Sequence, residues 1–217
     1  MNYMKSQILN LQILKNTLGP KGWIEDKEVI EPYLIEERGL FRGESFLLLK
    51  PQNIEEVSKI LKLCNEHNIK VVPQGGRTGL CGGTIPSENG QEIMLSLERM
   101  NNIKEFNEEN FTITVEAGCI LNNIQNIADE KNFLFPLSLA SEGSCTIGGN
   151  LSTNAGGINV LRYGMARDLV LGIEVVLANG EIWNNLTSLR KDNRGYDLKQ
   201  LFICLLYTSD AADEEDS

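Results

Sequence analysis

A chain of 217 residues and 24.2 kDa fits one domain, or two small domains packed together. Hydrophobic residues make up 41% and charged residues 23%, which allows a sizeable core and excludes a chain that is disordered by composition. The net charge of −10 argues against nucleic acid as a partner, because phosphate binding requires an excess of basic residues. No apolar run approaches the roughly 20 residues of a membrane span. The N-terminus shows no signal or transit pattern, so we expect a cytoplasmic protein.

Cysteine and histidine usage argues against disulfides and metals. The five cysteines are scattered singly with no CxxC pair, so we expect reduced thiols and no metal site. The one histidine, His67, is expected at the C-terminal end of a helix, where it interacts favourably with the helix dipole. We therefore assign no catalytic residue in this chain.

Periodicity and turn signals in the first half predict a β-α-β unit after an N-terminal helix. In chain order we expect a helix over 5–18, a short helix and connection over 26–42, a strand over 46–50, a helix from Asn53 to about His67, and a strand over 69–73. Asn53 is the expected N-cap, and Glu56 its capping-box partner. The two strands are expected to be parallel and joined right-handed.

The second half predicts a hairpin-rich arrangement. We expect strands over 92–97 and 111–118, a helix over 121–131, a strand over 133–136, a helical turn over 146–152, and two strands within 169–183. In the strand 111–118, Phe111, Ile113 and Val115 alternate with polar residues and are expected to point inward. Asn179-Gly180 is a strong hairpin signal. The fold class is α+β.

Two glycine-rich loops carry the chemistry. PQGGRTGLCGG (73–83) leaves a strand and supplies free N–H groups that can form a nest for a pyrophosphate. Walker A is excluded because no Lys follows a glycine pair there, and the Rossmann fingerprint is excluded by spacing and by the missing helix. A flexible surface loop is the alternative.

The second loop, SEGSCTIGGNLSTNAGG (141–157), strengthens the case for a ligand. Its small residues admit a planar ring, and its hydroxyls and amides can bond to the ring edge. The helical turn from Thr146 is expected to hold anionic or carbonyl oxygens at its N-terminus. Two such loops suit an extended dinucleotide.

Four motifs in order resemble one family. VPQGGRTGLCGG, FPLSLASEGSCTIGGNLSTNAGG, LRYGMARDLVLGIEVVLANGE and KDNRGYDLKQLFI are similar to the FAD-binding, PCMH-type half of the vanillyl-alcohol-oxidase superfamily. Within it they resemble the D-2-hydroxyacid dehydrogenase group, which includes the glycolate oxidase D subunit, D-lactate dehydrogenase and D-2-hydroxyglutarate dehydrogenase. The resemblance runs from about residue 40 to Ile203. It implies FAD held by two α+β subdomains.

The resemblance also implies which residues bind the cofactor. It assigns the pyrophosphate and ribitol to Pro73, Gln74, Gly75, Gly76, Arg77, Thr78, Gly79, Leu80, Gly82 and Gly83. It assigns the isoalloxazine and pyrophosphate to Pro136, Leu137, Ser138, Gly143, Ser144, Cys145, Thr146, Ile147, Gly148, Gly149, Asn150, Ser152, Thr153, Asn154, Ala155, Gly156 and Gly157. It assigns main-chain bonds to the adenine to Gly172, Ile173, Glu174, Val175 and Val176.

Side chains near these loops have more than one interpretation. Cys81 and Cys145 are expected to pack against the cofactor, with a redox thiol as the minor alternative. Arg162, Tyr163 and Arg167 are placed near cofactor or substrate, with a surface pair between Arg167 and Asp168 as the alternative. On resemblance alone, Asp192, Asn193, Arg194 and Tyr196 are placed on the active-site side.

The implied activity is oxidation of a D-2-hydroxyacid by hydride transfer from C2 to flavin N5, with electrons passed to an unidentified carrier. Attachment of FAD is expected to be noncovalent, because the first loop holds Arg77 and Thr78 where some relatives carry a histidine. The alternatives are a non-catalytic flavin-binding module and a same-fold enolpyruvyl-UDP-sugar reductase. A P-loop NTPase is disfavoured by the missing Lys.

The chain departs from the family after YDLKQLFI. Residues 205–217 carry five acids and no base, and we expect 204–217 to be a non-family tail, an artefact of a truncated reading frame. The expected organisation is an N-terminal helical extension over 1–42, an incomplete FAD-binding domain over 43–203, and that tail. The fragment by itself is expected to be inactive.

Overall fold

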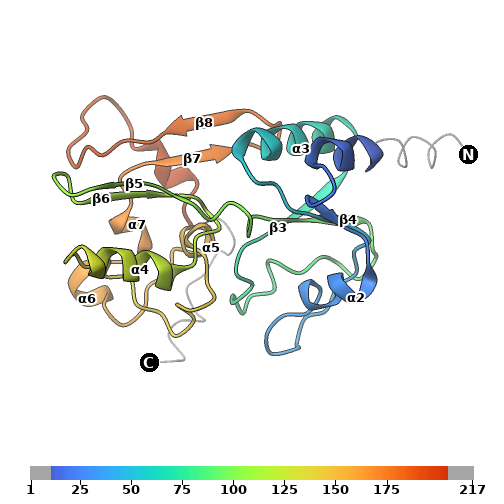
Figure 1. Ribbon diagram of the computed structural model, residues 1–217, viewed down its shortest axis with the longest axis horizontal. Helices are drawn as coiled ribbons and strands as arrows, with labels where there is room; N and C mark the ends of the chain where they lie inside the picture. The colour runs from blue at the N-terminus through green and yellow to red at the C-terminus, as the bar shows by residue number, and fades with distance from the viewer. Residues whose placement is uncertain (1–10, 205–217) are drawn as a thin grey trace, which may run out of the picture. The chain divides into compact units, whose positions relative to one another are not determined.

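The computed structural model describes residues 11–204, and the chain divides into two compact units (Figure 1). Unit 1 holds the described residues up to Gln74, together with Thr84–Met100 and Val175–Trp183. Unit 2 holds Gly75–Gly83, Asn101–Glu174 and the described residues from Asn184 onward. The start of the predicted helix over 5–18 and the acidic tail over 205–217 lie outside the described residues.

Unit 1 is built on a four-stranded sheet. Its elements are a helix over 11–18, β1 (Trp23–Ile24), α2 (Lys27–Ile30), η1 (Glu31–Tyr33), β2 (Leu48–Leu49), α3 (Ile54–Glu66), β3 (Lys70–Gln74) and β4 (Glu92–Ser96). The strand order is β1-β2-β4-β3, with β1 antiparallel to β2 and with β2 and β3 each parallel to β4. The predicted parallel direction of β2 and β3 is confirmed, but the two strands are not neighbours.

The sequence of β4 suits its central place between β2 and β3. Ile93, Met94 and Leu95 are all buried, and such a continuous apolar run is typical of a strand covered on both faces. The core of unit 1 packs the helix over 11–18 and α3 against this sheet through Leu14, Leu18, Leu47, Leu49, Val57, Ile60, Cys64, Ile93 and Leu95.

Helix α3 begins as predicted, at Asn53. The Asn53 Oδ1 accepts a 2.9 Å hydrogen bond from the Glu56 N–H. The Glu56 carboxylate accepts from the Gln52 N–H at 2.9 Å, one residue before the position that a capping box requires. His67 is the C-cap residue, as predicted.

Unit 2 packs helices against a two-stranded ribbon. Its elements are β5 (Ile103–Asn107), β6 (Thr112–Val115), α4 (Leu121–Glu130), α5 (Ile147–Thr153), α6 (Val160–Tyr163), α7 (Ala166–Leu169) and η2 (Leu198–Leu201). β5 and β6 pair antiparallel, and Figure 1 shows them side by side. Ile124 of α4 packs in one cluster with Ile113 and Val115 of β6.

Two predictions in unit 2 are wrong. Phe111 does not point inward, because its φ of +56° turns the chain before β6 and leaves the side chain 66% exposed. The segment 133–136 is not a strand. The Phe133 ring lies edge-on to the rings of Phe106 and Phe111, at centroid distances of 5.5 and 5.4 Å. The Pro136 carbonyl at its end accepts from the Asn159 side chain.

The predicted hairpin is present and is formed by β7 (Ile173–Val176) and β8 (Ile182–Asn185). Gly180 has a φ of +85°, and the Asn179 Oδ1 accepts from the Glu181 N–H at 3.0 Å. The turn belongs to unit 1, where the Ser58 hydroxyl of α3 donates to the Gly180 carbonyl at 2.6 Å. Among residues 11–204, no helix is long and apolar enough to cross a membrane.

Candidate functional site

The two glycine-rich loops meet in unit 2 through their backbones. A Cβ added at Gly76 would lie 2.3 Å from the Ser144 carbonyl oxygen and 2.8 Å from the Cys145 Cα. A Cβ added at Gly75 would lie 2.5 Å from the Thr146 Oγ1. Side chains never approach so closely, so glycine is required at both positions for the loops to touch. The structure thus brings together two loops that are far apart in the sequence.

The second loop is fastened to the end of β6. The Ile147 N–H donates to the Cys119 carbonyl at 2.9 Å, and the Gly148 N–H donates to the Ala117 carbonyl at 2.8 Å. A Cβ at Gly148 would lie 2.7 Å from the Ala117 Cβ. The predicted helical turn is confirmed as α5, but these first N–H groups bind protein carbonyls. These two N–H groups are therefore occupied within the protein, and the expectation that this helix terminus holds a ligand's oxygens stays a prediction.

A second set of glycines is not required by packing against residues 11–204. Within that part of the chain, a Cβ at Gly79 or Gly143 would meet no heavy atom within 4 Å, and one at Gly149 would meet only the Thr146 Oγ1 at 3.5 Å, an ordinary contact. None of the three has a backbone conformation that demands glycine. Small residues beside open space fit the close approach of a ligand.

Two buried polar atoms beside these glycines lack partners. Within residues 11–204, the Thr146 Oγ1 and the Asn150 Oδ1 are buried and make no hydrogen bond. Thr146 occupies the N-cap position of α5 without capping it, and the residue is only 5% exposed. Unsatisfied buried polar groups are rare and costly, which marks this end of α5 as a place that is completed by another group.

The predicted stretch 136–138 is held by protein groups. The Leu137 carbonyl accepts from the Gln125 amide at 2.7 Å, and the Ser138 carbonyl accepts from the Ile158 N–H at 3.2 Å. A Cβ at Gly157 would lie 1.9 Å from the Ser138 oxygen, and Gly157 has a φ of +82°. Gly157 is thus fixed by packing and by backbone conformation.

The predicted segment 172–176 forms the start of the hairpin. Gly172 packs on the returning chain, because a Cβ there would lie 2.4 Å from the Thr187 nitrogen and 2.5 Å from the Asn185 oxygen. The Asn184 amide donates to the Glu174 carboxylate. Among the described residues β7 pairs only with β8, so one edge of β7 has no strand neighbour.

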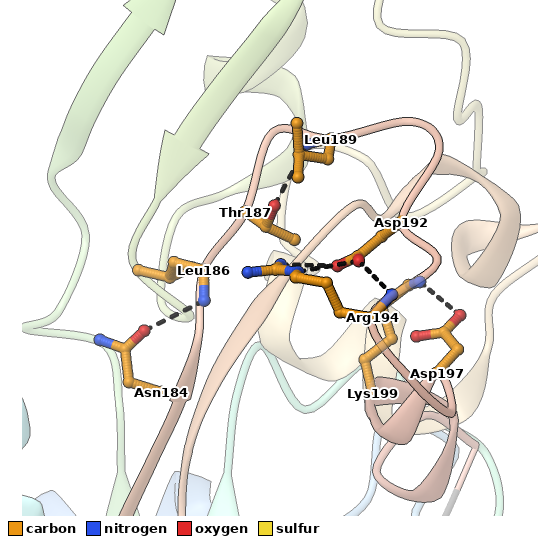
Figure 2. Close-up of polar contacts among 8 residues, drawn as sticks. All are labelled: Asn184, Leu186, Thr187, Leu189, Asp192, Arg194, Asp197 and Lys199. Atoms are coloured by element: carbon orange, nitrogen blue, oxygen red, sulfur yellow. Dashed lines mark hydrogen bonds and ion pairs between the residues drawn. The ribbon is translucent and has the colours of Figure 1, made fainter.

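The segment that follows β8 is organised by local contacts. Figure 2 shows the Asp192 carboxylate against the Arg194 guanidinium and the Asp197 carboxylate beside the Lys199 ammonium. The Arg194 guanidinium holds the pKa of Asp192 down at about 2. Arg194 and Tyr196 are both exposed. Their placement on an active-site side stays a prediction.

Arg167 is bound by residues near the end of the described chain. Its guanidinium donates to the Gln200 side chain and, at 3.0 Å, to the Ile203 carbonyl. Asp168 instead accepts from the Met165 N–H at 2.8 Å. Among the described residues, the alternative of a surface arginine paired with Asp168 is not formed by Arg167, which instead binds the end of the described chain.

All five cysteines are free thiols, as expected. Cys145 is 2% exposed and packs in a cluster with Leu121 and Leu137, so it fills protein space. Cys81 is exposed. Burial raises the pKa of Cys64 to about 12, which keeps that thiol protonated. No group of metal-ligating side chains occurs within 11–204.

Sequence reasoning missed a buried carboxylate directly before Ala117, whose carbonyl accepts from the second loop. Glu116 follows β6, is buried, and accepts 2.8 Å hydrogen bonds from both the backbone and the side-chain amide of Asn102. The Lys104 ammonium lies 2.6 Å from its other oxygen. Burial pushes the pKa of Glu116 up, but these hydrogen bonds outweigh burial and hold it below the ordinary value. The signal was an acid directly before Ala117-Gly118, at the end of an apolar strand.

The comparisons place this chain in a class. The model of a family described as "FAD binding domain" matches residues 47–185. The solved structures with a similar fold include alkyldihydroxyacetonephosphate synthase (TM-score 0.80, 18% identity, 91% of this chain and 37% of that one). They also include p-cresol methylhydroxylase (TM-score 0.74, 22% identity, 94% and 41%). The chain belongs to the FAD-binding domain family, with the PCMH-type α+β fold.

Sequence relatives narrow the class further. The D-2-hydroxyglutarate dehydrogenase of Arabidopsis thaliana, named as mitochondrial, is 46% identical over 89% of this chain and 34% of its own length. The corresponding protein of Bos taurus is 49% identical over 85% and 34%. A D-2-hydroxyglutarate–pyruvate transhydrogenase of Saccharomyces cerevisiae is 48% identical over 75% and 32%. The predicted resemblance to the D-2-hydroxyacid dehydrogenase group is confirmed. The chain spans about a third of the length of these relatives.

The residues present fit FAD. The unpartnered Thr146 hydroxyl and Asn150 amide oxygen can bond to polar edges, and the open space at Gly79, Gly143 and Gly149 admits a ligand against bare backbone. The first loop adds one cation, Arg77, whose φ of +60° places it in the left-handed region typical of anion nests. These observations lie on unit 2 itself.

Proposed function

We propose that this chain is the FAD-binding part of an oxidoreductase that acts on a D-2-hydroxyacid. The observation that carries the cofactor is the contact between the two glycine loops, beside glycines that face open space. The names of the relatives support the substrate class. Bound flavin would supply the redox chemistry by accepting a hydride from C2 of the hydroxyacid at N5.

The chain's own residues bind and orient. Gly75 and Gly76 hold the first loop against the second, while Thr146 and Asn150 offer polar groups to the cofactor. We propose that attachment is noncovalent, since neither loop contains a histidine and His67 lies at the C-terminus of α3. Heating the flavin-loaded protein in denaturant should release all flavin into the filtrate, and flavin retained on the chain would contradict this proposal.

Two titrations test cofactor binding. Gly79→Val fills open space with a side chain, so we expect FAD affinity to fall about tenfold or more while the thermal midpoint without FAD is unchanged. Gly195→Val is the matched control, because Gly195 also has open space and lies outside both loops. Flavin fluorescence quenching gives the dissociation constants. Equal FAD affinity in wild type and Gly79→Val, or no saturable binding by wild type, would overturn the proposal.

The cellular compartment is a separate proposal. Several relatives carry "mitochondrial" in their names, which does not fit the cytoplasmic expectation. We propose that this protein works where those relatives do, and fractionation of the source cells followed by immunodetection tests it. Detection in the cytosol alone would restore the earlier expectation.

A further inference from the structure

The first glycine loop has a buried clamp at its base. Gln74 is the last residue of unit 1 before the loop, and Thr84 is the first residue of unit 1 after it. The Gln74 side chain is 2% exposed, and its Nε2 donates to the Thr84 carbonyl at 2.6 Å and to the Tyr33 carbonyl at 2.9 Å. One amide thus joins the two ends of the loop to each other and to η1.

The orientation of this amide is dictated by its surroundings. Two carbonyl oxygens face the Nε2, so the reverse orientation would direct oxygen at oxygen. The Gln74 Oε1 is buried and has no hydrogen-bond partner within 11–204. The Gln74 side chain thus leaves its acceptor oxygen without a partner while its amide nitrogen makes both donor contacts. This arrangement indicates that the two donor contacts are what keeps a glutamine at this position.

Tyr33 is itself held in place. Its hydroxyl donates to the Glu98 carboxylate at 3.0 Å, and the Ser96 hydroxyl donates to the same oxygen at 3.2 Å. The Lys50 ammonium pairs with the other Glu98 oxygen. Lys50 follows β2, and Ser96 and Glu98 lie at and just after the end of β4, so the clamp rests on the carboxyl ends of the two inner strands of the sheet.

The return segment is also fixed. A Cβ at Gly43 would lie 1.8 Å from the Pro86 carbonyl oxygen, and the Glu44 N–H donates to the Ser87 carbonyl at 3.1 Å. Both sides of the loop base are therefore anchored in unit 1, and Gln74 is the side chain that connects them.

We propose that Gln74 is a positioning residue for the cofactor loop, acting through Thr84 and Tyr33 rather than by touching FAD. This inference rests on the proposed function and changes the role that the family resemblance implied for Gln74. A loop whose ends are already joined loses less conformational freedom when it closes on a ligand, so the clamp should raise FAD affinity.

The first test compares Gln74→Leu with Ser58→Ala in the full chain. Gln74→Leu introduces an apolar side chain of similar size and removes the amide that makes both donor contacts. Ser58→Ala removes an equally short side-chain-to-carbonyl bond elsewhere in unit 1. Limited trypsin digestion reports opening of the loop, because Arg77 is the only Lys or Arg within 75–83. We expect Gln74→Leu to be cut at Arg77 roughly tenfold faster and to bind FAD roughly tenfold more weakly, with Ser58→Ala unchanged in both.

The second test uses a pH profile that loss of packing alone would not produce. In Gln74→Glu, a protonated carboxyl can donate to one of the two carbonyls, whereas the ionised form directs negative charge at both. The measured quantity is the rate of cleavage at Arg77 in Gln74→Glu divided by the rate in wild type at the same pH. This ratio should be higher at pH 8.5 than at pH 6. This variant decides the question if Gln74→Leu fails to fold.

The outcomes separate the two proposals. Unchanged cleavage at Arg77 in Gln74→Leu, or a flat pH profile in Gln74→Glu, overturns the clamp whether or not FAD binds. Faster cleavage with unchanged FAD affinity overturns its role in cofactor binding. A wild-type chain that binds no FAD overturns the proposed function instead, and cleavage at Arg77 still decides whether Gln74 holds the loop.

Discussion

Adding one methyl group at Gly76 should separate the two glycine loops. The new Cβ in Gly76→Ala would lie 2.3 Å from the Ser144 carbonyl oxygen, about 1 Å short of an ordinary contact. It would also lie 2.8 Å from the Cys145 Cα. Both obstacles are backbone atoms, so no side-chain rotation relieves them. The φ of Gly76 is one that alanine adopts readily, so the cost is purely steric.

The expected cost is about 2–3 kcal/mol, at the upper end of what overpacking in a well-packed region costs. For a chain of this size, that lowers the thermal midpoint by about 4–12 °C. Because the first loop moves with Gly76, FAD affinity should fall in the same variant.

Gly79→Ala is the matched control for stability. It makes the same substitution three residues away, where a Cβ meets no heavy atom within 4 Å. Thermal and urea unfolding without FAD should give a midpoint for Gly79→Ala at or slightly above that of wild type. If Gly76→Ala unfolds at the same midpoint as Gly79→Ala, the contact between the loops does not contribute to stability and the reasoning is refuted.

Three further predictions concern the contribution of Glu116 to stability, the dependence of that contribution on pH, and the turn between β7 and β8. Glu116→Gln loses the Lys104 pair and should lower the free energy of unfolding by about 1–2 kcal/mol at pH 7, measured in urea. Because the folded pKa of Glu116 lies below its ordinary value of 4.5, its stabilisation is present above that pH and lost as pH falls through the folded pKa. The difference in the free energy of unfolding between wild type and Glu116→Gln should therefore narrow below about pH 4.5, and a difference that does not change with pH would contradict the role given to Glu116. Gly180→Ala should lower the free energy of unfolding by about 1–3 kcal/mol in the same assay, because φ is +85° and the Cβ would lie 2.7 Å from the Ser58 carbonyl. Asn179→Ala removes only a turn hydrogen bond and should lower it by less.

Local signals predicted much of the fold. The N-cap at Asn53, the turn at Asn179-Gly180 and the strand over 92–97 are each decided by a few adjacent residues, and each is confirmed. The position of β4 between β2 and β3 could not be predicted, because pairing of strands distant in sequence leaves no local pattern. β5 was missed for a related reason: a register shift between Ile103 and Glu105 breaks the alternation that marks a strand.

The failures at Phe111 and at 133–136 share a physical cause. Both stretches are rich in aromatic and apolar residues, which favours a strand assignment. In the structure the Phe133 ring lies edge-on to the rings of Phe106 and Phe111, so these aromatic residues contact one another through their rings and not through strand pairing of 133–136, while Phe111 stays largely exposed. At the end of this segment the Asn159 side chain donates to the Pro136 carbonyl, which a neighbouring strand would otherwise bind.

That these loops bind the cofactor stays a prediction, but the structure assigns different contacts to residues that the sequence leaves alike. From the sequence, every residue of QGGRTG is a candidate to touch the cofactor, because glycine, amide and cation all suit a phosphate. The structure separates them: the Gln74 amide faces the Thr84 and Tyr33 carbonyls, Gly76 lies against Ser144, and Gly79 borders open space. Such a separation predicts three different phenotypes within six residues. A change at Gln74 should loosen the loop, one at Gly76 should lower stability, and one at Gly79 should weaken FAD binding alone. If all three changes gave one phenotype, the loop would act as a single unit and the three residues would not have separate roles.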